Sequence, residues 1–256
     1  MKIYGSNLSF KNNRARSHIL QTLQAIQDSR RYNAWIYDRI KNYLFGSVLD
    51  IGSGLGDIAR QFTGQLVVNV VLSDFDDKMV DALNATVLPF KNYRVMPLDI
   101  TDPQILKQPA TARQFDTVTC VNVLEHIKDD ASALRHMKHL LKDNGRIVIL
   151  VPALPSIYGT LDSLVGHHRR YTKKSLSAVF ARAGLTVKDA YHLNFWGIFT
   201  WFLAGKVFQK KQFDAVTCRR LDRIVPVLKM FETFGPPPVG QSLIMVGEKS
   251  FNGIAS

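Results

Sequence analysis

Apolar residues follow two different patterns along the chain. Some form short unbroken runs, which is typical of strands buried on both faces of a parallel sheet, and others recur three and four residues apart, which is typical of amphipathic helices. The runs predict strands at residues 48–51, 66–72, 93–100, 115–122, 146–151, 185–191 and 242–247. The helical spacings predict helices at residues 17–26, 32–44, 57–62, 78–83 and 133–141, a further helix from about residue 173, and a last helix that prolines 236–238 close.

The repeated alternation of strand and helix predicts the fold class. It is α/β, with a doubly wound parallel sheet that helices cover on both faces. In such sheets ligands bind at the carboxyl ends of the strands. Side chains that directly follow the strands are therefore the first candidates for a site.

Three alternate glycines, Gly52, Gly54 and Gly56, follow the first predicted strand. Glycine lets the backbone turn sharply and approach a ligand closely, so the segment predicts a strand, a nucleotide-type loop and a helix. A dinucleotide fingerprint requires glycine five positions after the first one, where this chain has Asp57. Asp57 and Asp50 would repel a pyrophosphate but attract a cationic ligand such as S-adenosylmethionine, which carries a sulfonium and an ammonium.

The sequence of residues 48–56, VLDIGSGLG, resembles the first motif of the class I S-adenosylmethionine-dependent methyltransferases. The similarity is to their small-molecule branch, types 11 and 12, and covers most of the chain. It implies a Rossmann-like, mostly parallel sheet of seven strands with an antiparallel last strand, and S-adenosylmethionine as the cofactor. It also implies an N-terminal helical cap at residues 1–45 and a methyltransferase domain at residues 46–256, with a helical cover inserted at residues 153–235.

Several strand ends match the cofactor motifs of this family. Asp74, at the end of the second strand, fits the ribose diol, because a carboxylate can accept a hydrogen bond from both hydroxyls. Phe75 would border the adenine, while Asp99 and the backbone of Ile100 would face its amino group and ring. The predicted cofactor residues are Tyr32, Asp50, Gly52, Ser53, Gly54, Gly56, Asp74, Phe75, Asp99, Ile100 and Asn122.

Residues for the methyl acceptor are predicted outside the glycine loop. The segments 31–35, RYNAW, and 166–171, GHHRRY, resemble parts of the same branch, and residues 195–205 are the most aromatic stretch of the chain. Alternatives for the aromatic stretch are a membrane interface, a dimer contact or core packing. The predicted acceptor residues are Tyr32, Trp35, Arg169, Arg170, Tyr171, Phe195 and Trp196.

A general base is needed only if the acceptor is a hydroxyl, a protonated amine or a carbon acid. Histidine has a suitable pKa, and the candidates are His126, after the fourth strand, and His167 and His168 in the basic loop. His126 could instead orient the cofactor, and the basic loop could grip an anionic group. No metal site is predicted, because the two lone cysteines lack the spacing of zinc ligands.

The net charge of +12 is unevenly distributed. Residues 1–48 carry 8 basic and 2 acidic side chains and residues 163–225 carry 12 and 3, whereas residues 49–162 carry 11 and 14. The excess outside the cofactor core favours an anionic acceptor, a phosphorylated carrier or an acidic membrane surface, with solvated helix faces as the alternative. The two cysteines favour a reducing cytoplasm, and neither a signal peptide nor a spanning segment is expected.

Three other functions are alternatives to methylation of a small molecule. Enzymes that methylate exocyclic base amines carry an Asn/Asp-Pro-Pro-aromatic turn, whereas this chain has Asn-Val-Leu-Glu at 122–125, so a nucleic-acid substrate is disfavoured despite the charge. Asp57 disfavours a nicotinamide oxidoreductase. A non-catalytic cofactor-binding scaffold or regulatory partner is the third alternative. The sequence predicts methyl transfer to oxygen or nitrogen of a small molecule that is apolar in part and anionic in part, such as a natural product or a lipid- or sugar-linked compound. The protein is expected to be able to touch a membrane or form a homodimer.

Overall fold

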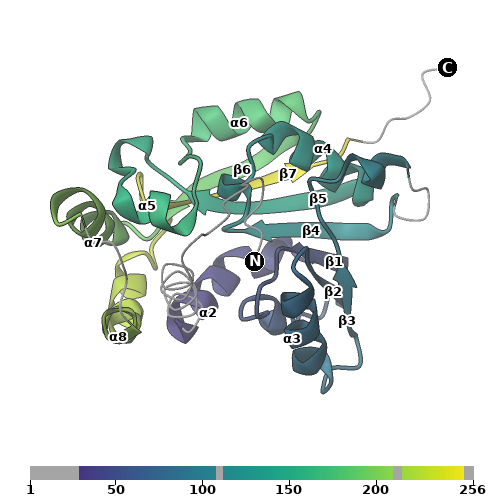
Figure 1. Ribbon diagram of the computed structural model, residues 1–256, viewed down its shortest axis with the longest axis horizontal. Helices are drawn as coiled ribbons and strands as arrows, with labels where there is room; N and C mark the ends of the chain where they lie inside the picture. The colour runs from purple at the N-terminus through teal and green to yellow at the C-terminus, as the bar shows by residue number, and fades with distance from the viewer. Residues whose placement is uncertain (1–28, 108–111, 210–214, 251–256) are drawn as a thin grey trace, which may run out of the picture.

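Seven strands form one mixed sheet in the computed structural model, which describes residues 29–107, 112–209 and 215–250 (Figure 1). Their order across the sheet is β3-β2-β1-β4-β5-β7-β6. The strands are β1 (Gly46–Ile51), β2 (Val67–Asp74), β3 (Tyr93–Pro97), β4 (Phe115–Val121), β5 (Leu141–Pro152), β6 (Thr186–Leu193) and β7 (Ser242–Glu248).

The direction of the strands confirms the predicted Rossmann-like sheet. β1 pairs in parallel with β2 and β4, and the pairs β2–β3 and β4–β5 are parallel as well. β7 lies between β5 and β6 and is antiparallel to both. The carboxyl ends of β1, β4 and β5 therefore meet at one edge, where the loops that follow them form the site.

Helices cover both faces of this sheet, as the alternating pattern predicts (Figure 1). On one face Leu134, Met137 and Phe180 pack into the core, and on the other Trp35 and Leu83 do so. Full burial of side chains of this size stabilises the fold by about 1.5–3 kcal/mol each. The helices are α2 (Arg30–Ile40), α3 (Asp77–Val87), α4 (Asp130–Leu140), α5 (Thr160–Val165), α6 (Lys173–Arg182), α7 (Gly197–Phe202) and α8 (Ala215–Phe231).

The predicted cover at residues 153–235 is divided into two parts. α6 and β6 belong to the layers of the sheet, so the cover consists of a segment with α5 before them and a segment with α7 and α8 after them. Figure 1 shows α5, α7 and α8 gathered at one end of the sheet. The helix predicted at residues 17–26 lies outside the described residues, whereas the next predicted helix is α2, which ends at Ile40.

The helix predicted directly after the glycine loop is wrong. Residues 57–62 contain only a 3₁₀ turn, Ala59–Gln61. The hydroxyl of Tyr93 donates to the carbonyls of Ala59 and Phe62 at 3.0 and 3.2 Å, and the Phe62 side chain is fully buried. These contacts tie the segment to the sheet below it and leave too few residues for an α-helix before β2 begins.

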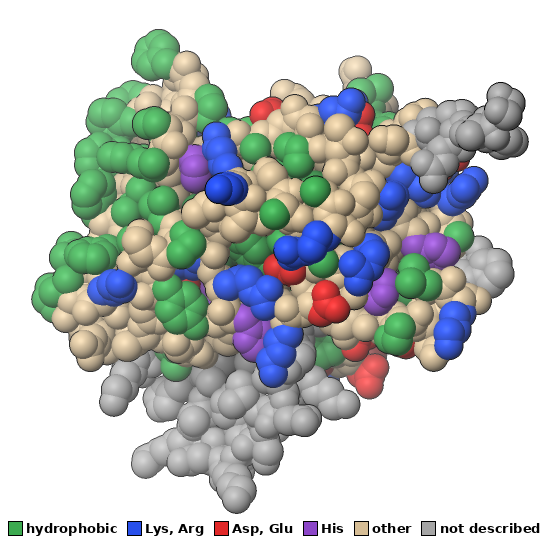
Figure 2. All heavy atoms as spheres, turned by 90° about the horizontal axis from the view of Figure 1, so that it is seen from above, with side chains coloured by type: hydrophobic (Ala, Val, Ile, Leu, Met, Phe, Trp, Pro, Cys, Tyr) green, Lys and Arg blue, Asp and Glu red, His purple; other side chains and the backbone are tan. Residues whose placement is uncertain are grey.

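Large apolar side chains lie exposed on the second part of the cover. Figure 2 shows them gathered on the side of the molecule where α7 lies. We call this set the cover face. It consists of Trp196, Phe199, Phe202, Leu203, Val207, Phe208, Ile224, Val227, Met230, Phe231 and Phe234, all 41% exposed or more.

Candidate active site

A cavity of about 650 Å³ opens where the loops after β1, β4 and β5 meet the cover. The glycine loop forms one part of its wall, the turn after β4 forms another, and α2 and the cover close it. This is the edge at which a doubly wound sheet binds ligands. The residues that line the cavity include Tyr32, Trp35, Asp50, Gly52, Ser53, Asn122, Glu125, His126, His167, Arg170, Trp196, Phe199 and Trp201.

The glycine loop has the backbone that its sequence predicts. Gly52, Gly54 and Gly56 have φ angles of +68°, +58° and +79°, in the left-handed region that favours glycine. A Cβ on Gly52 would lie 2.6 Å from Cγ2 of Val123. The loop therefore needs glycine both for its conformation and for its contact with the turn after β4.

Asp50 is buried at the end of β1, beside this loop. Its Oδ1 accepts a hydrogen bond from the Thr119 hydroxyl at 2.6 Å, and its Oδ2 accepts one from Ser53 at 2.7 Å. Burial raises the pKa of Asp50 to about 6, although both hydrogen bonds lower it. A cation beside this carboxylate would favour its ionised form.

Asp74 fixes the loop from the side of β2. Its Oδ2 accepts a hydrogen bond from the backbone amide of Gly54 at 3.1 Å, and burial raises its pKa. Asp74 does not line the cavity, and neither do Phe75, Asp99 and Ile100. The Asp99 carboxylate is exposed and accepts hydrogen bonds from Thr101, so the ribose and adenine assignments stay predictions.

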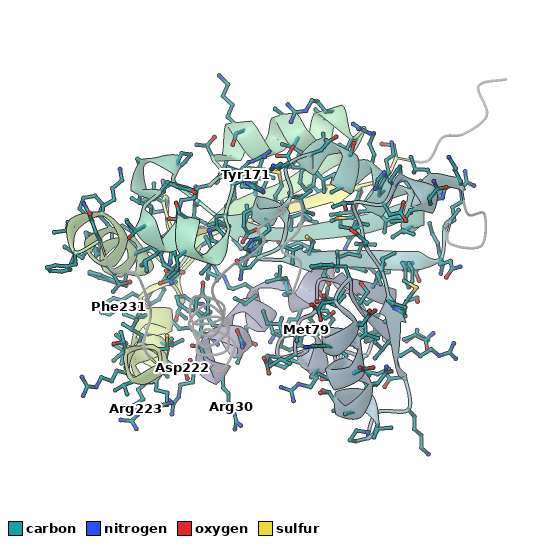
Figure 3. All side chains as sticks on the ribbon, viewed as in Figure 1. Arg30, Met79, Tyr171, Asp222, Arg223 and Phe231 are labelled. Atoms are coloured by element: carbon teal, nitrogen blue, oxygen red, sulfur yellow. The ribbon has the colours of Figure 1, made fainter. Side chains whose placement is uncertain are left out.

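α2 brings Tyr32 and Trp35 to the cavity. The Tyr32 hydroxyl lies 3.3 Å from the hydroxyl of Ser242, and Trp35 is 1% exposed. Asp222 of α8 accepts a hydrogen bond from the amide of Tyr32 at 3.0 Å, and Figure 3 shows Asp222 where α8 meets the start of α2, near Arg30. A carboxylate at the positive end of a helix is favourable, so Asp222 holds α2 against the cover.

A cluster of titratable side chains forms a further part of the cavity wall. Nε2 of His167 lies 3.7 Å from Oε1 of Glu125, and the rings of His126 and His167 are 4.8 Å apart. Nδ1 of His167 lies 2.9 Å from Oδ1 of Asp162, and Nδ1 of His126 lies 3.2 Å from the carbonyl of Gly166. A carbonyl only accepts hydrogen bonds, and so does an ionised carboxylate; each Nδ1 therefore carries the proton and each Nε2 has a free lone pair.

Burial controls the protonation of this cluster. It raises the pKa of Glu125 to about 8 and is the main cause that lowers the pKa of His126 to about 3. Burial also lowers the pKa of His167. For Asp162 burial favours the neutral acid, but the hydrogen bond from His167 and the charge of Arg170 outweigh it and lower the pKa. Both histidines are therefore neutral at pH 7, and Asp162 is ionised.

Glu125 and Asp162 were missed from the sequence, whereas Trp201 was covered only as part of the aromatic stretch 195–205. Asp162 does not line the cavity itself but holds residues that do. Asp162 pairs with the guanidinium of Arg170 at 2.7 Å and accepts a hydrogen bond from the Trp201 indole at 2.9 Å. The Arg170 guanidinium lies 5.0 Å from the centre of the Trp201 ring. The available signal for Glu125 was a carboxylate among apolar residues directly after β4; Asp162 and Trp201 are 39 residues apart, and only the fold brings them together.

The comparison with protein families now identifies the chain. A family model described as a methyltransferase domain matches residues 13–190. The chain belongs to this methyltransferase family. It is a member of the class I S-adenosylmethionine-dependent methyltransferases, whose cofactor is S-adenosylmethionine, and this sets aside the nicotinamide alternative.

Relatives and solved structures agree with the family. The methyltransferase is 26% identical over 144 residues to a ubiquinone/menaquinone biosynthesis C-methyltransferase of Citrifermentans bemidjiense, covering 56% of this chain and 60% of that one. It is 27% identical over 188 residues to a ubiquinone biosynthesis O-methyltransferase of Aeromonas salmonicida, covering 67% and 76%. The chain thus spans about 60% of the length of the first of these relatives.

Two solved structures show the same fold. A chain from the complex between the Haloferax volcanii Trm112 methyltransferase activator and a methyltransferase superposes with a TM-score of 0.63 and 16% identity, covering 93% of this chain and 99% of that one. A geranyl diphosphate methyltransferase in complex with its cofactor gives a TM-score of 0.58 and 8% identity, covering 86% and 85%.

The methyltransferase structure corrects several predicted acceptor contacts. Arg169 donates to Asp130 at 2.8 Å and to the carbonyl of Lys128, away from the cavity lining. Tyr171 is 2% exposed, and its hydroxyl lies 3.1 Å from Oδ2 of Asp130, so it belongs to the core. Both side chains point toward α4, where they contact Asp130 at the start of the helix.

Two further predicted residues, His168 and Phe195, lie beside the cavity without lining it. The backbone amide of His168 donates to the carbonyl of Glu125 at 2.8 Å, which anchors the basic loop on the turn after β4. Phe195 packs against the rings of Trp196 and Phe199, and these two line the cavity in its place.

Proposed function

We propose that this chain transfers the methyl group of S-adenosylmethionine to an oxygen or nitrogen of a small-molecule acceptor. One observation carries the proposal: a single cavity joins the glycine loop to the buried wall of Glu125, His126 and His167. In such a transfer the acceptor atom forms a bond to the methyl carbon while the carbon–sulfur bond breaks. Alignment of donor and acceptor in a pocket shielded from water supplies much of the rate.

The glycine loop is the donor end of the cavity. Asp50, at the base of the loop, places a carboxylate where the cationic methionine part of the donor would lie, and Gly52 and Ser53 line the cavity beside it. We assign the ribose to Asp74 and the adenine to Phe75, Asp99 and Ile100 by the family resemblance. Tyr32 and Asn122 complete the donor end, because both line the same cavity.

The opposite end suits an acceptor that is largely apolar. Trp35, Trp196 and Phe199 supply aromatic walls, and Nη2 of Arg170 has no hydrogen-bond partner within the described part of the chain. An acceptor oxygen could therefore bind Arg170, although Asp162 already balances its charge. Relatives named for ubiquinone and menaquinone biosynthesis support an apolar acceptor of this kind.

His126 and His167 are the predicted catalytic residues that face the cavity. A hydroxyl or protonated amine must lose a proton as it is methylated, and a neutral imidazole that lines the cavity, His167 in the first place, could accept it. Such groups are of no use to an acceptor that is already a free nucleophile. The wall therefore favours a protonated oxygen or nitrogen acceptor.

The cover face favours contact with an anionic membrane surface. Exposed aromatic side chains such as Phe208, Phe231 and Phe234 and the exposed cations Arg219, Arg220 and Arg223 all lie on α8 or close to it in sequence, and Figure 3 shows Arg223 and Phe231 on α8 at the edge of the molecule. Aromatic and basic residues together are typical of proteins that lie at a bilayer interface. No helix among the described residues is long and apolar enough to cross a membrane.

Vesicle sedimentation tests this contact. We expect binding to vesicles of phosphatidylcholine with phosphatidylserine, weaker binding to phosphatidylcholine alone, and loss of binding in the double variant Phe231→Ser, Phe234→Ser. Leu88→Ser is the matched control, because Leu88 is 83% exposed but follows α3. A stable dimer in the absence of lipid, dissociated by the same double variant, would favour the homodimer instead.

Calorimetry and a labelling assay test the proposed function itself. The protein should bind S-adenosylmethionine but neither a nicotinamide dinucleotide nor RNA. Purified protein incubated with labelled methyl donor and a cell extract of small molecules should yield a labelled small-molecule product. Donor binding without any labelled product would favour the non-catalytic scaffold. Label in nucleic acid would favour a nucleic-acid methyltransferase.

A further inference from the structure

We propose that Glu125, His126 and His167 bind a divalent transition-metal cation at the acceptor end of the cavity. One ligand atom from each of the three lies within 4.8 Å of the others. Metal–nitrogen and metal–oxygen distances of about 2.0–2.2 Å place neighbouring ligand atoms roughly 3–3.5 Å apart. The 3.7 Å between Nε2 of His167 and Oε1 of Glu125 is close to this separation, so small side-chain shifts complete the site.

The hydrogen bonds of the two histidines support metal binding. A histidine that binds a metal usually donates its other ring N–H to a carboxylate or a backbone carbonyl, which fixes the tautomer and the direction of the ring. His167 has Asp162 in this position, at 2.9 Å, and His126 has the carbonyl of Gly166, at 3.2 Å. Both Nε2 lone pairs are thus free for one ion.

Glu125 supplies a second, independent observation. Its side chain is fully buried, it lines the cavity, and neither carboxyl oxygen accepts a hydrogen bond from another described residue. A buried polar group without partners is costly unless something binds it. The neighbouring carboxylate of Asp162 is already paired with Arg170, so Glu125 is the carboxyl group that a bound cation would ionise and pair with.

Two histidines and one carboxylate suit zinc, manganese, iron or cobalt, and three protein ligands leave coordination positions open. Because the three residues line the cavity, the open positions would face the acceptor. The role of the ion rests on the proposed function, and it replaces the histidines as the aid to proton loss, since their Nε2 lone pairs would be bound to it. An acceptor hydroxyl bound to the ion would release its proton to water more readily, and the oxygen would then attack the methyl carbon as the carbon–sulfur bond breaks.

Cobalt titration of untagged, chelator-stripped protein tests the site. We expect one Co²⁺ per chain, visible d–d absorption bands, and competition by Zn²⁺ in calorimetry. Glu125→Gln and His167→Gln should each weaken Co²⁺ binding by more than about 100-fold, since loss of a ligand costs more than the 10–100-fold loss that second-shell changes cause. The adjacent His168→Gln is the control and should bind Co²⁺ like the wild type, because His168 does not line the cavity.

Binding of S-adenosylmethionine, measured on the same samples with a chelator present, shows whether each variant is folded and keeps the two proposals separate. If Glu125→Gln does not bind the donor, and so is not folded, His126→Gln is used as the test variant in its place. The metal proposal is overturned if the wild type binds neither Co²⁺ nor Zn²⁺, or if the folded variants bind Co²⁺ as tightly as the wild type. If the protein then binds the donor and transfers the methyl group in the presence of chelator, the proposed function holds and needs no metal.

Discussion

Nδ1 of His167 lies 2.9 Å from Oδ1 of Asp162, a carboxylate that no solvent reaches. The same carboxylate binds Arg170 and the indole of Trp201, so one buried group positions residues from α5, the basic loop and α7. Because His167 and Trp201 both line the cavity, the shape of its acceptor end depends on Asp162.

Removal of that carboxylate should destabilise the protein strongly. Asp162→Ala leaves Arg170 buried without its partner, and breaking a buried pair on one side costs about 3–5 kcal/mol. Chemical denaturation should show this loss in the free energy of unfolding. Asp38→Ala is the control, because its ion pairs with Lys41 and Lys229 both lie at the surface and should each contribute less than about 1 kcal/mol. Equal effects of both substitutions would contradict the structural role of Asp162.

Gly52→Ala should damage the glycine loop. An alanine at φ +68° is strained, and its Cβ would meet Val123 at 2.6 Å. We expect a loss of about 1–3 kcal/mol in the free energy of unfolding and a rise of about tenfold or more in the dissociation constant for S-adenosylmethionine. Gly64→Ala is the matched control, because its nearest contact would be 3.8 Å away, and it should change stability by less than about 0.5 kcal/mol.

The pKa of Asp50 predicts a pH dependence. Burial raises this pKa from 3.8 to about 6 in the folded protein, so the folded state holds the proton more tightly than the unfolded state does. The resulting stabilisation is present at low pH and is lost as the pH rises through 6. Between pH 5 and pH 7.5 the wild type should lose about 1–2 kcal/mol of unfolding free energy relative to Asp50→Asn.

Donor binding should follow the opposite trend. The ionised Asp50 attracts the cationic donor, so affinity for S-adenosylmethionine should rise with pH across the same range. Calorimetric titrations at several pH values measure it, and Asp50→Asn should show a flat profile. If the wild-type affinity does not change with pH, Asp50 does not interact with the methionine part of the donor.

Asp74→Ala tests the ribose assignment. Loss of a charged partner of two hydroxyls should weaken donor binding by about 1.5–3 kcal/mol, or about 10- to 150-fold in the dissociation constant. Asp76→Ala is the control, because Asp76 caps α3 through the amides of Lys78 and Met79 and should affect stability rather than donor affinity. An unchanged dissociation constant in Asp74→Ala would refute the assignment.

Much of the fold could be predicted because its signals are local. Unbroken apolar runs identify the seven strands, and three glycines with positive φ angles identify the loop after β1. The helix predicted at residues 78–83 is α3, which Asp76 caps. The helix after the glycine loop was the main error, since contacts from Tyr93, over thirty residues away, ended it as a single turn.

The residue sequence by itself thus determined the family, the sheet and the glycine loop, because strand periodicity and glycine conformations depend on neighbours in the chain. Only the tertiary structure decided which other residues meet at the cavity. It directed Arg169 and Tyr171 to α4, and it brought Glu125 together with His167 and Asp162 inside one buried wall. Contacts between residues this far apart depend on how the cover packs on the sheet, and no local pattern encodes that packing.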